Sequence, residues 1–88
     1  MELIFSPKAV ADIELLKRSG HTAVRKRLER ILQSIANTPS EGFAKPEQLK
    51  YELAGKWSRE LSKKDRVVYK INDDCVEILS ILGHYYDK

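Results

Sequence analysis

Residues 49–82 decide the fold, and they read LKYELAGKWSRELSKKDRVVYKINDDCVEILSIL. Apolar and polar side chains alternate through this stretch, which is the period of strands with one buried face. The pattern predicts four strands, at Leu49 to Leu53, Trp57 to Leu61, Arg66 to Ile71 and Val76 to Leu82. The connections between them are short and turn-like. Because connections of this length join antiparallel neighbours, we expect a small, mainly antiparallel sheet.

Upstream of this stretch, the apolar residues recur at the spacing of helices. Glu2 to Ser6 is predicted to be a first strand. A helix then begins, because the Ser6 hydroxyl can accept from unpaired helix amides and Pro7 sits where its missing N–H costs nothing. This helix is expected to end at Ser19-Gly20, and a second to run from about Thr22 to Asn37. The expected fold is α+β, in the order β-α-α-β-β-β-β, with both helices on one face of the sheet and a ligand surface on the other.

The composition is that of a single globular domain spanning residues 1–88, with 42% hydrophobic and 33% charged residues. No apolar run approaches the roughly 20 residues that cross a bilayer, and the N-terminus lacks the pattern of a secretory signal. We therefore expect no membrane partner. Cys75 is the only cysteine, so no internal disulfide can form, which fits a reducing cytoplasm. No Cys or His pair has the spacing of metal ligands, so no metal or other cofactor is predicted.

The positive charge is concentrated in two segments. Residues 17–30 contain six Lys or Arg against Glu29, and residues 45–70 contain eight against four acidic residues. Basic helices are often only solvated surfaces. Two basic segments in so short a chain nevertheless favour a nucleic acid as the partner.

Three motifs and a terminal pair carry a resemblance to a known family. They are Lys45-Pro46-Glu47-Gln48-Leu49-Lys50, Leu53-Ala54-Gly55-Lys56-Trp57-Ser58-Arg59, Arg66-Val67-Val68-Tyr69 and His84-Tyr85. In these motifs the chain resembles the YoeB/Txe family of bacterial toxins, within the RelE-like superfamily. The family pattern runs roughly GKPEPLK, LSGxWSRR, HRLVY and a final HY. The resemblance covers essentially the whole chain and implies a RelE-like fold.

The resemblance implies a toxin of a toxin–antitoxin system that acts in the bacterial cytoplasm. It implies a ribosome-dependent endoribonuclease that cuts mRNA in the decoding site, next to rRNA, and so inhibits translation. It also implies a cognate antitoxin of the Phd/YefM type, which would mask the site with an acidic segment. Operator DNA would be bound only through the antitoxin complex. A homodimer is left open.

Three residues are the candidates for catalysis. RNA can be cleaved without a metal when its 2′-hydroxyl attacks the adjacent phosphorus, which requires a base, an acid and stabilisation of the extra charge. The resemblance implies Glu47 as the base, His84 as the acid and Arg66 as the stabilising cation. Taken alone, each residue is more typical of a surface ion pair or a chain end. It is the motif match that favours a catalytic role.

Three more residues are the candidates for binding substrate. Lys50 would add a point charge at the phosphate, and Arg59 a second guanidinium that matches phosphate oxygens. Tyr85 would stack on a base or bind a phosphate. Trp57 and Tyr69 are expected in the core, although alternation places Trp57 on the same side as Arg59.

Four departures from the family pattern keep other functions open. Glu60 replaces a second arginine, Gln48 a second proline and Asp65 a histidine, and the chain continues through residues 86–88. By alternation, Glu60 should face away from Arg59 and weaken polyanion binding. One alternative is a ParE-type toxin that binds DNA gyrase, which the Glu47 and His84 pairing disfavours. The other is a catalytically weakened module that binds RNA or antitoxin.

Overall fold

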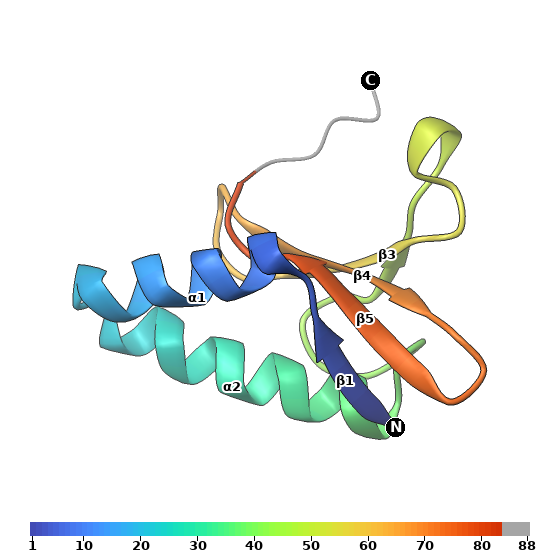
Figure 1. Ribbon diagram of the computed structural model, residues 1–88, viewed down its shortest axis with the longest axis horizontal. Helices are drawn as coiled ribbons and strands as arrows, with labels where there is room; N and C mark the ends of the chain where they lie inside the picture. Colours follow the sequence, from blue (N-terminus) through green and yellow to red (C-terminus); the bar gives the residue numbers. More distant parts are fainter. Residues whose placement is uncertain (84–88) are drawn as a thin grey trace.

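Two helices lie along one face of a five-stranded sheet in the computed structural model, which describes residues 1–83 (Figure 1). The elements are β1 (Glu2–Phe5), α1 (Pro7–Ser19), α2 (Thr22–Asn37), β2 (Glu47–Gln48), the 3₁₀ helix η1 (Tyr51–Leu53), β3 (Trp57–Glu60), β4 (Arg66–Ile71) and β5 (Cys75–Ser80). The predicted α+β fold and its order of elements are confirmed. Within residues 1–83, neither helix is long and apolar enough to cross a membrane.

The strands lie in the order β1-β5-β4-β3-β2. The pairs β2–β3, β3–β4 and β4–β5 are antiparallel, as their short connections require, whereas β1 pairs with β5 in parallel. The chain between β1 and β5 includes both helices and the strands β2 to β4, so the connection is much longer than a parallel pairing needs. The sheet is therefore mixed but mainly antiparallel, as predicted.

The first helix begins and ends where its local sequence indicates. The Ser6 hydroxyl accepts a hydrogen bond from the Ala9 amide at 3.0 Å and donates one to the Leu79 carbonyl at 2.8 Å. Pro7 occupies the first turn, and Gly20 ends the helix with a φ of 78°. The cap thus also joins α1 to the far end of β5.

One predicted strand is wrong. Leu49 to Leu53 is not a strand, because β2 comprises only Glu47–Gln48 and the chain then coils into η1. Pairing with the β3 side ends where the Leu49 amide donates to the Lys56 carbonyl at 2.9 Å. Tyr51 then takes a φ of 59° and is 74% exposed. The apolar alternation is real, but the chain must reverse here to enter β3, so it makes a turn instead of a longer strand.

The core fills the space between the helices and the sheet. Its fully buried members include Ile31 and Ile35 from α2 and Val67, Tyr69 and Ile78 from the sheet. Tyr69 is buried as predicted, and Trp57 packs against the core while remaining partly accessible. Because strand residues alternate, the intervening side chains of β3 and β4 face the side without helices.

Candidate active site

The strand pairing places residues of β2, β3 and β4 next to one another on the face of the sheet that has no helices. Glu47 of β2 pairs with Ser58 of β3, and Ser58 pairs with Val68 of β4. Arg66 lies two residues before Val68 on the same face, opposite Glu60 of β3. The open face thus gathers a carboxylate and a guanidinium from distant parts of the chain.

Glu47 and Arg66 form an ion pair on this face. Arg66 Nη1 lies 3.7 Å from Glu47 Oε1. The Glu47 side chain is 57% exposed and the Arg66 side chain 33% exposed. An ion pair this long and open to water contributes little to stability, so either group can exchange its partner for a ligand. A carboxylate can accept a proton, and a guanidinium can match two phosphate oxygens.

The loop before β2 fixes where Glu47 emerges. Ala44 and Lys45 have φ values of 73° and 56°, a left-handed conformation that is uncommon for residues other than glycine. The Ala44 carbonyl accepts from the Glu60 amide at 2.9 Å. Pro46 follows with its ring-restricted φ. Two unusual backbone conformations next to a candidate base are typical of functional sites.

Arg59 does not join this site, and its predicted role as a phosphate ligand is corrected. The residue is 0% exposed and faces the helices. Its Nη1 donates to Ser34 Oγ at 2.8 Å and to the Phe43 carbonyl at 2.7 Å. Its Nε donates to the Tyr69 hydroxyl at 3.0 Å. The cause is strand alternation, which puts Arg59 on the opposite face from Glu60.

The buried guanidinium instead organises the loop that leads from α2 to β2. Arg59 Nη2 donates to the carbonyls of Thr38 and Glu41 at 2.8 and 2.9 Å. The Tyr69 hydroxyl donates to the Pro39 carbonyl at 2.6 Å. Burial raises the pKa of Tyr69, although Arg59 acts in the other direction. Together Arg59 and Tyr69 satisfy carbonyls that would otherwise be left without donors in the interior.

Glu60 lies beside the candidate site and faces away from Arg59, as predicted. One of its carboxylate oxygens lies 3.6 Å from Nζ of Lys45. Its backbone carbonyl accepts two hydrogen bonds from the Arg27 guanidinium, at 2.8 and 3.1 Å. Glu60 is also the register partner of Arg66. The departure from the family pattern thus adds a negative charge next to the cations of the open face.

The remaining predicted residues are placed as follows. Lys50 is exposed, three residues beyond Glu47 at the start of η1, and its contact with a phosphate stays a prediction. His84 and Tyr85 lie outside the described residues. The chain reaches them from Gly83, whose amide donates to Asp65 Oδ1 at 2.7 Å. Asp65 directly precedes Arg66, so the described chain ends against the residue before the candidate cation.

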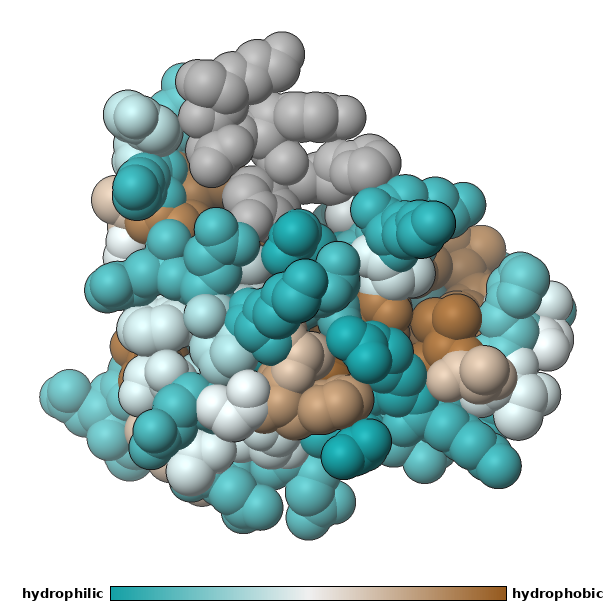
Figure 2. Space-filling view, turned by 180° about the vertical axis from the view of Figure 1, so that it is seen from behind, coloured by the Kyte–Doolittle hydropathy of each residue, from teal (hydrophilic) through white to brown (hydrophobic). Residues whose placement is uncertain are grey.

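Cations also gather on α2. Arg27 and Arg30 both stack on the Phe43 ring, with 4.9 and 4.1 Å between the guanidinium carbon and the ring centroid. Seen from behind, the molecule shows mostly hydrophilic residues, with apolar residues confined to separate areas (Figure 2).

No group of three or more His, Cys, Asp or Glu residues within residues 1–83 could hold a metal ion.

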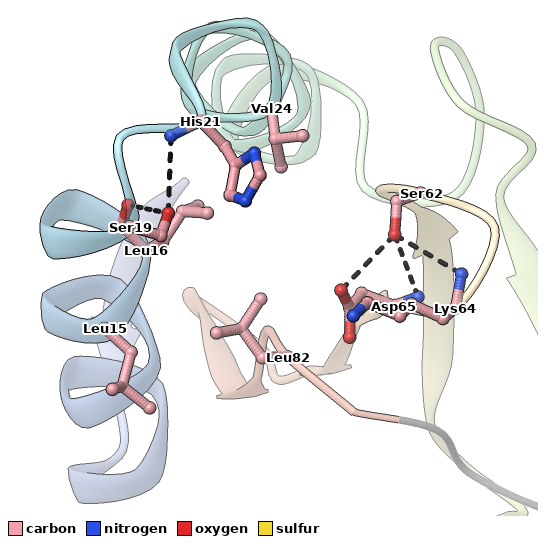
Figure 3. Close-up of a pocket in the computed structure, with 9 residues that line it drawn as sticks. All are labelled: Leu15, Leu16, Ser19, His21, Val24, Ser62, Lys64, Asp65 and Leu82. Carbon is pink, nitrogen blue, oxygen red and sulfur yellow. Dashed lines mark hydrogen bonds between the residues drawn. The ribbon is translucent and has the colours of Figure 1, made fainter.

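A groove of about 420 Å³ lies apart from the ion pair, between the end of α1, the start of α2 and the β3–β4 connection (Figure 3). Its lining residues are Leu15, Leu16, Ser19, His21, Val24, Ser62, Lys64, Asp65 and Leu82. The lining contains neither Glu47 nor Arg66, so the groove is not the candidate active site. Among the lining residues, Asp65 directly precedes Arg66 in the sequence.

Three residues that contact the backbone before His84 or pair with Glu60 were not singled out as ligands or anchors by sequence reasoning. Asp12 and Asp65 bind the backbone before His84, and Lys45 pairs with Glu60. The sequence of α1, from the Ser6-Pro7 helix start to Asp12, carried no signal of these contacts. The contacts join segments that are far apart in the sequence. Asp65 could have been noticed only as a departure from the family pattern.

Known proteins resemble this chain in sequence and structure. The family model for YoeB-like toxins of bacterial type II toxin–antitoxin systems matches residues 5–85. Toxin YoeB of Escherichia coli O6:H1 (strain CFT073) is 35% identical over 85 residues, which is 97% of this chain and 100% of that protein. The YoeB/ParE toxin from Agrobacterium tumefaciens superposes with a TM-score of 0.89 at 28% identity, covering 97% of this chain and 100% of the other.

Two structures from Staphylococcus aureus are also similar, a YoeB dimer and a heterotetrameric YoeB–YefM complex. Their TM-scores are 0.84 and 0.83, at 32% identity, and each match covers 97% of this chain and 98% of the other. Sequence motifs, fold and relatives agree over nearly the full length. The chain belongs to the YoeB-like toxin family of bacterial type II toxin–antitoxin systems.

Proposed function

We propose that this toxin is a ribosome-dependent endoribonuclease that cleaves mRNA in the decoding site and thereby inhibits translation in the bacterial cytoplasm. The observation that carries the proposal is the Glu47–Arg66 pair, 3.7 Å apart on the open face of the sheet. Membership of the YoeB-like family supports it. The pair places a proton acceptor and a phosphate-binding cation next to each other on one surface.

In the proposed reaction, Glu47 takes the proton of the 2′-hydroxyl as its oxygen attacks the adjacent phosphorus. Arg66 exchanges its contact with Glu47 for the phosphoryl oxygens and stabilises their extra charge. His84 donates a proton to the departing 5′-oxygen. The products are a 2′,3′-cyclic phosphate and a 5′-hydroxyl, so the step needs neither an external nucleophile nor a metal.

The exposure of the site supports a dependence on the ribosome. The Glu47 side chain is 57% exposed, and its partner Arg66, 33% exposed, lies on the face of the sheet without helices. Such a surface cannot by itself hold a flexible RNA strand in the in-line geometry that the reaction requires. The ribosome would supply the opposite wall, and exposed cations of α2, such as Arg25 and Lys26, would contact rRNA phosphates. Lys50 and Tyr85 would bind the substrate itself.

The relatives also suggest protein partners. Since the S. aureus YoeB was solved with YefM, we propose a cognate YefM-type antitoxin whose acidic segment covers the site. Operator DNA would be bound only by the toxin–antitoxin complex. Since a YoeB dimer is known from S. aureus, a homodimer is proposed for the free toxin.

The experiment is cleavage of a defined mRNA on purified translating ribosomes, with the RNA ends mapped. Glu47→Gln, Arg66→Gln and His84→Ala should each reduce cleavage by at least about 100-fold. Glu52→Gln is the matched control, because it removes another exposed carboxylate of the same region. Wild-type activity in Glu47→Gln and Arg66→Gln would refute the proposed mechanism.

The second candidate is a gyrase-binding toxin of the ParE type, which the name of the A. tumefaciens structure keeps in view. Growth arrest with defective DNA supercoiling and intact mRNA would favour it. A third outcome, antitoxin binding without arrest, would indicate a catalytically weakened module. Expression of the wild type beside Glu47→Gln separates the three.

A further inference from the structure

Two carboxylates hold three consecutive amides at the end of the described chain. Asp12 Oδ2 accepts from the amides of Ile81 and Leu82, at 2.9 and 3.0 Å. Asp65 Oδ1 accepts from the next amide, that of Gly83, at 2.7 Å. These contacts follow β5 directly and precede His84 by one residue. We call Asp12 and Asp65, with the three amides, the carboxylate bracket.

Asp12 is the buried half of the bracket. It lies on α1, is 5% exposed and receives a hydrogen bond of 2.8 Å from Lys8. Lys8 also donates to the Leu82 carbonyl at 3.1 Å. The same lysine therefore binds both Asp12 and the backbone that Asp12 holds. Burial alone raises the pKa of Asp12, but hydrogen bonds from Lys8, Ile81 and Leu82 lower it below its ordinary value. The carboxylate is therefore ionised and accepting at neutral pH.

Asp65 is the half that faces the groove, where Figure 3 shows it beside Ser62 and across from Leu82. The Ser62 hydroxyl donates to Asp65 Oδ2 at 3.3 Å and accepts from the Asp65 amide at 3.1 Å. The Asp65 carbonyl accepts from the amides of Leu61 and Ser62, both at 3.1 Å. The turn thus determines the position of the carboxylate before it meets Gly83.

We propose that Asp65, supported by Asp12, is a positioning residue for the acid step: it fixes the backbone of residues 81–83, from which the chain continues to His84. This rests on the proposed ribonuclease function. Gly83 has a φ of 115°, a conformation that other residues rarely adopt, so the backbone bends at the amide that Asp65 holds. Asp65 also directly precedes Arg66 in the chain. One side chain therefore links the residue before the candidate cation to the residue before the candidate acid.

The physical need for such a link is large. A proton donor displaced by about 1 Å can cost on the order of 100-fold in rate. The family pattern has a histidine at the position of Asp65, so the resemblance assigns this carboxylate no role. Its contact with Gly83 supplies one.

The test is single-turnover mRNA cleavage on ribosomes by Asp65→Ala, Asp65→Asn and the matched control Asp74→Ala, an aspartate of the distant β4–β5 turn. Asp65→Ala should lower the maximal rate by about 10- to 100-fold without changing the toxin concentration that gives half of it. Asp65→Asn keeps an oxygen acceptor and should stay within about threefold of wild type. Asp74→Ala should match wild type.

A double-mutant cycle with His84→Ala separates positioning from general damage. If Asp65 acts through His84, Asp65→Ala should cause no further loss once His84 has been removed. An equal loss in both backgrounds, or no loss in the wild-type background, would overturn the inference. Full activity of His84→Ala alone would instead contradict the proposed general acid, so the two failures are distinguishable.

Ser62→Ala provides a second variant if Asp65→Ala does not fold. It leaves the carboxylate in place but removes the hydroxyl that orients it, so the rate should fall by about three- to tenfold. Thermal unfolding followed by circular dichroism should show a wild-type midpoint for Ser62→Ala. Wild-type cleavage by this folded variant would also count against the bracket.

Discussion

Replacement of Arg59 by methionine should destabilise the domain severely. The Arg59 guanidinium donates five hydrogen bonds of 3.0 Å or shorter, three of them to backbone carbonyls of the loop between α2 and β2. Methionine fills similar space but leaves those carbonyls without a donor. Each such carbonyl costs about 1–3 kcal/mol when it stays buried. Because residues 40–42 are accessible to solvent, water can reach part of the loop, so we expect about 3–5 kcal/mol in total.

The assay is urea unfolding followed by fluorescence of Trp57, the only tryptophan. With an m-value of about 1 kcal/mol/M for a domain of this size, the midpoint should fall by about 3 M or more. Such a loss is a large part of the roughly 5–15 kcal/mol that holds a domain folded. Arg30→Met is the matched control, since it removes an arginine that only stacks on Phe43, for about 0.5–1 kcal/mol.

The result that would refute this reasoning is an Arg59→Met variant as stable as Arg30→Met. A phosphate ligand would behave in that way, with normal stability and impaired RNA binding. The assay therefore decides between the role predicted from the motif and the role indicated by burial.

Two further predictions concern charge. Glu60→Arg restores the family's cation and removes the anion beside Lys45 and Arg66. It should tighten ribosome binding several-fold and steepen the salt dependence of that binding. Binding that is unchanged from wild type at two salt concentrations would contradict this prediction. Because the folded-state pKa of Asp12 lies below its ordinary 3.8, its stabilising contribution is present above that value and is lost as the pH falls through the lowered pKa. Asp12→Asn should flatten this acid dependence in unfolding measured between about pH 5 and pH 2, and an unchanged slope would count against it.

Local signals were sufficient for the helices and most strands. The Ser6-Pro7 start and the Gly20 end of α1 were predicted because caps depend on residues adjacent in sequence. The strand at Arg66–Ile71 was likewise predicted from its alternation. The prediction of a strand at residues 49–53 was wrong because alternation does not reveal where a strand loses its partner. There the need to turn into β3 outweighed the local preference.

The candidate site divides in the same way. Glu47 and Arg66 were named from motifs, and the register brings them onto one face. Arg59 was misassigned because arginine is usually accessible, and its burial depends on carbonyls from a loop about 20 residues away. The contacts of Asp12 and Asp65 with residues 81–83 join segments whose proximity exists only after folding.

The sequence by itself determined the family, the order of helices and strands, and the types of residue available for acid–base chemistry, because these depend on local composition and spacing. Only the tertiary structure decided which of the cations face a ligand and which are interior supports. The physical reason is that a strand sends alternate side chains to opposite faces, and the cost of burying a charge depends on donors and acceptors brought from elsewhere in the chain.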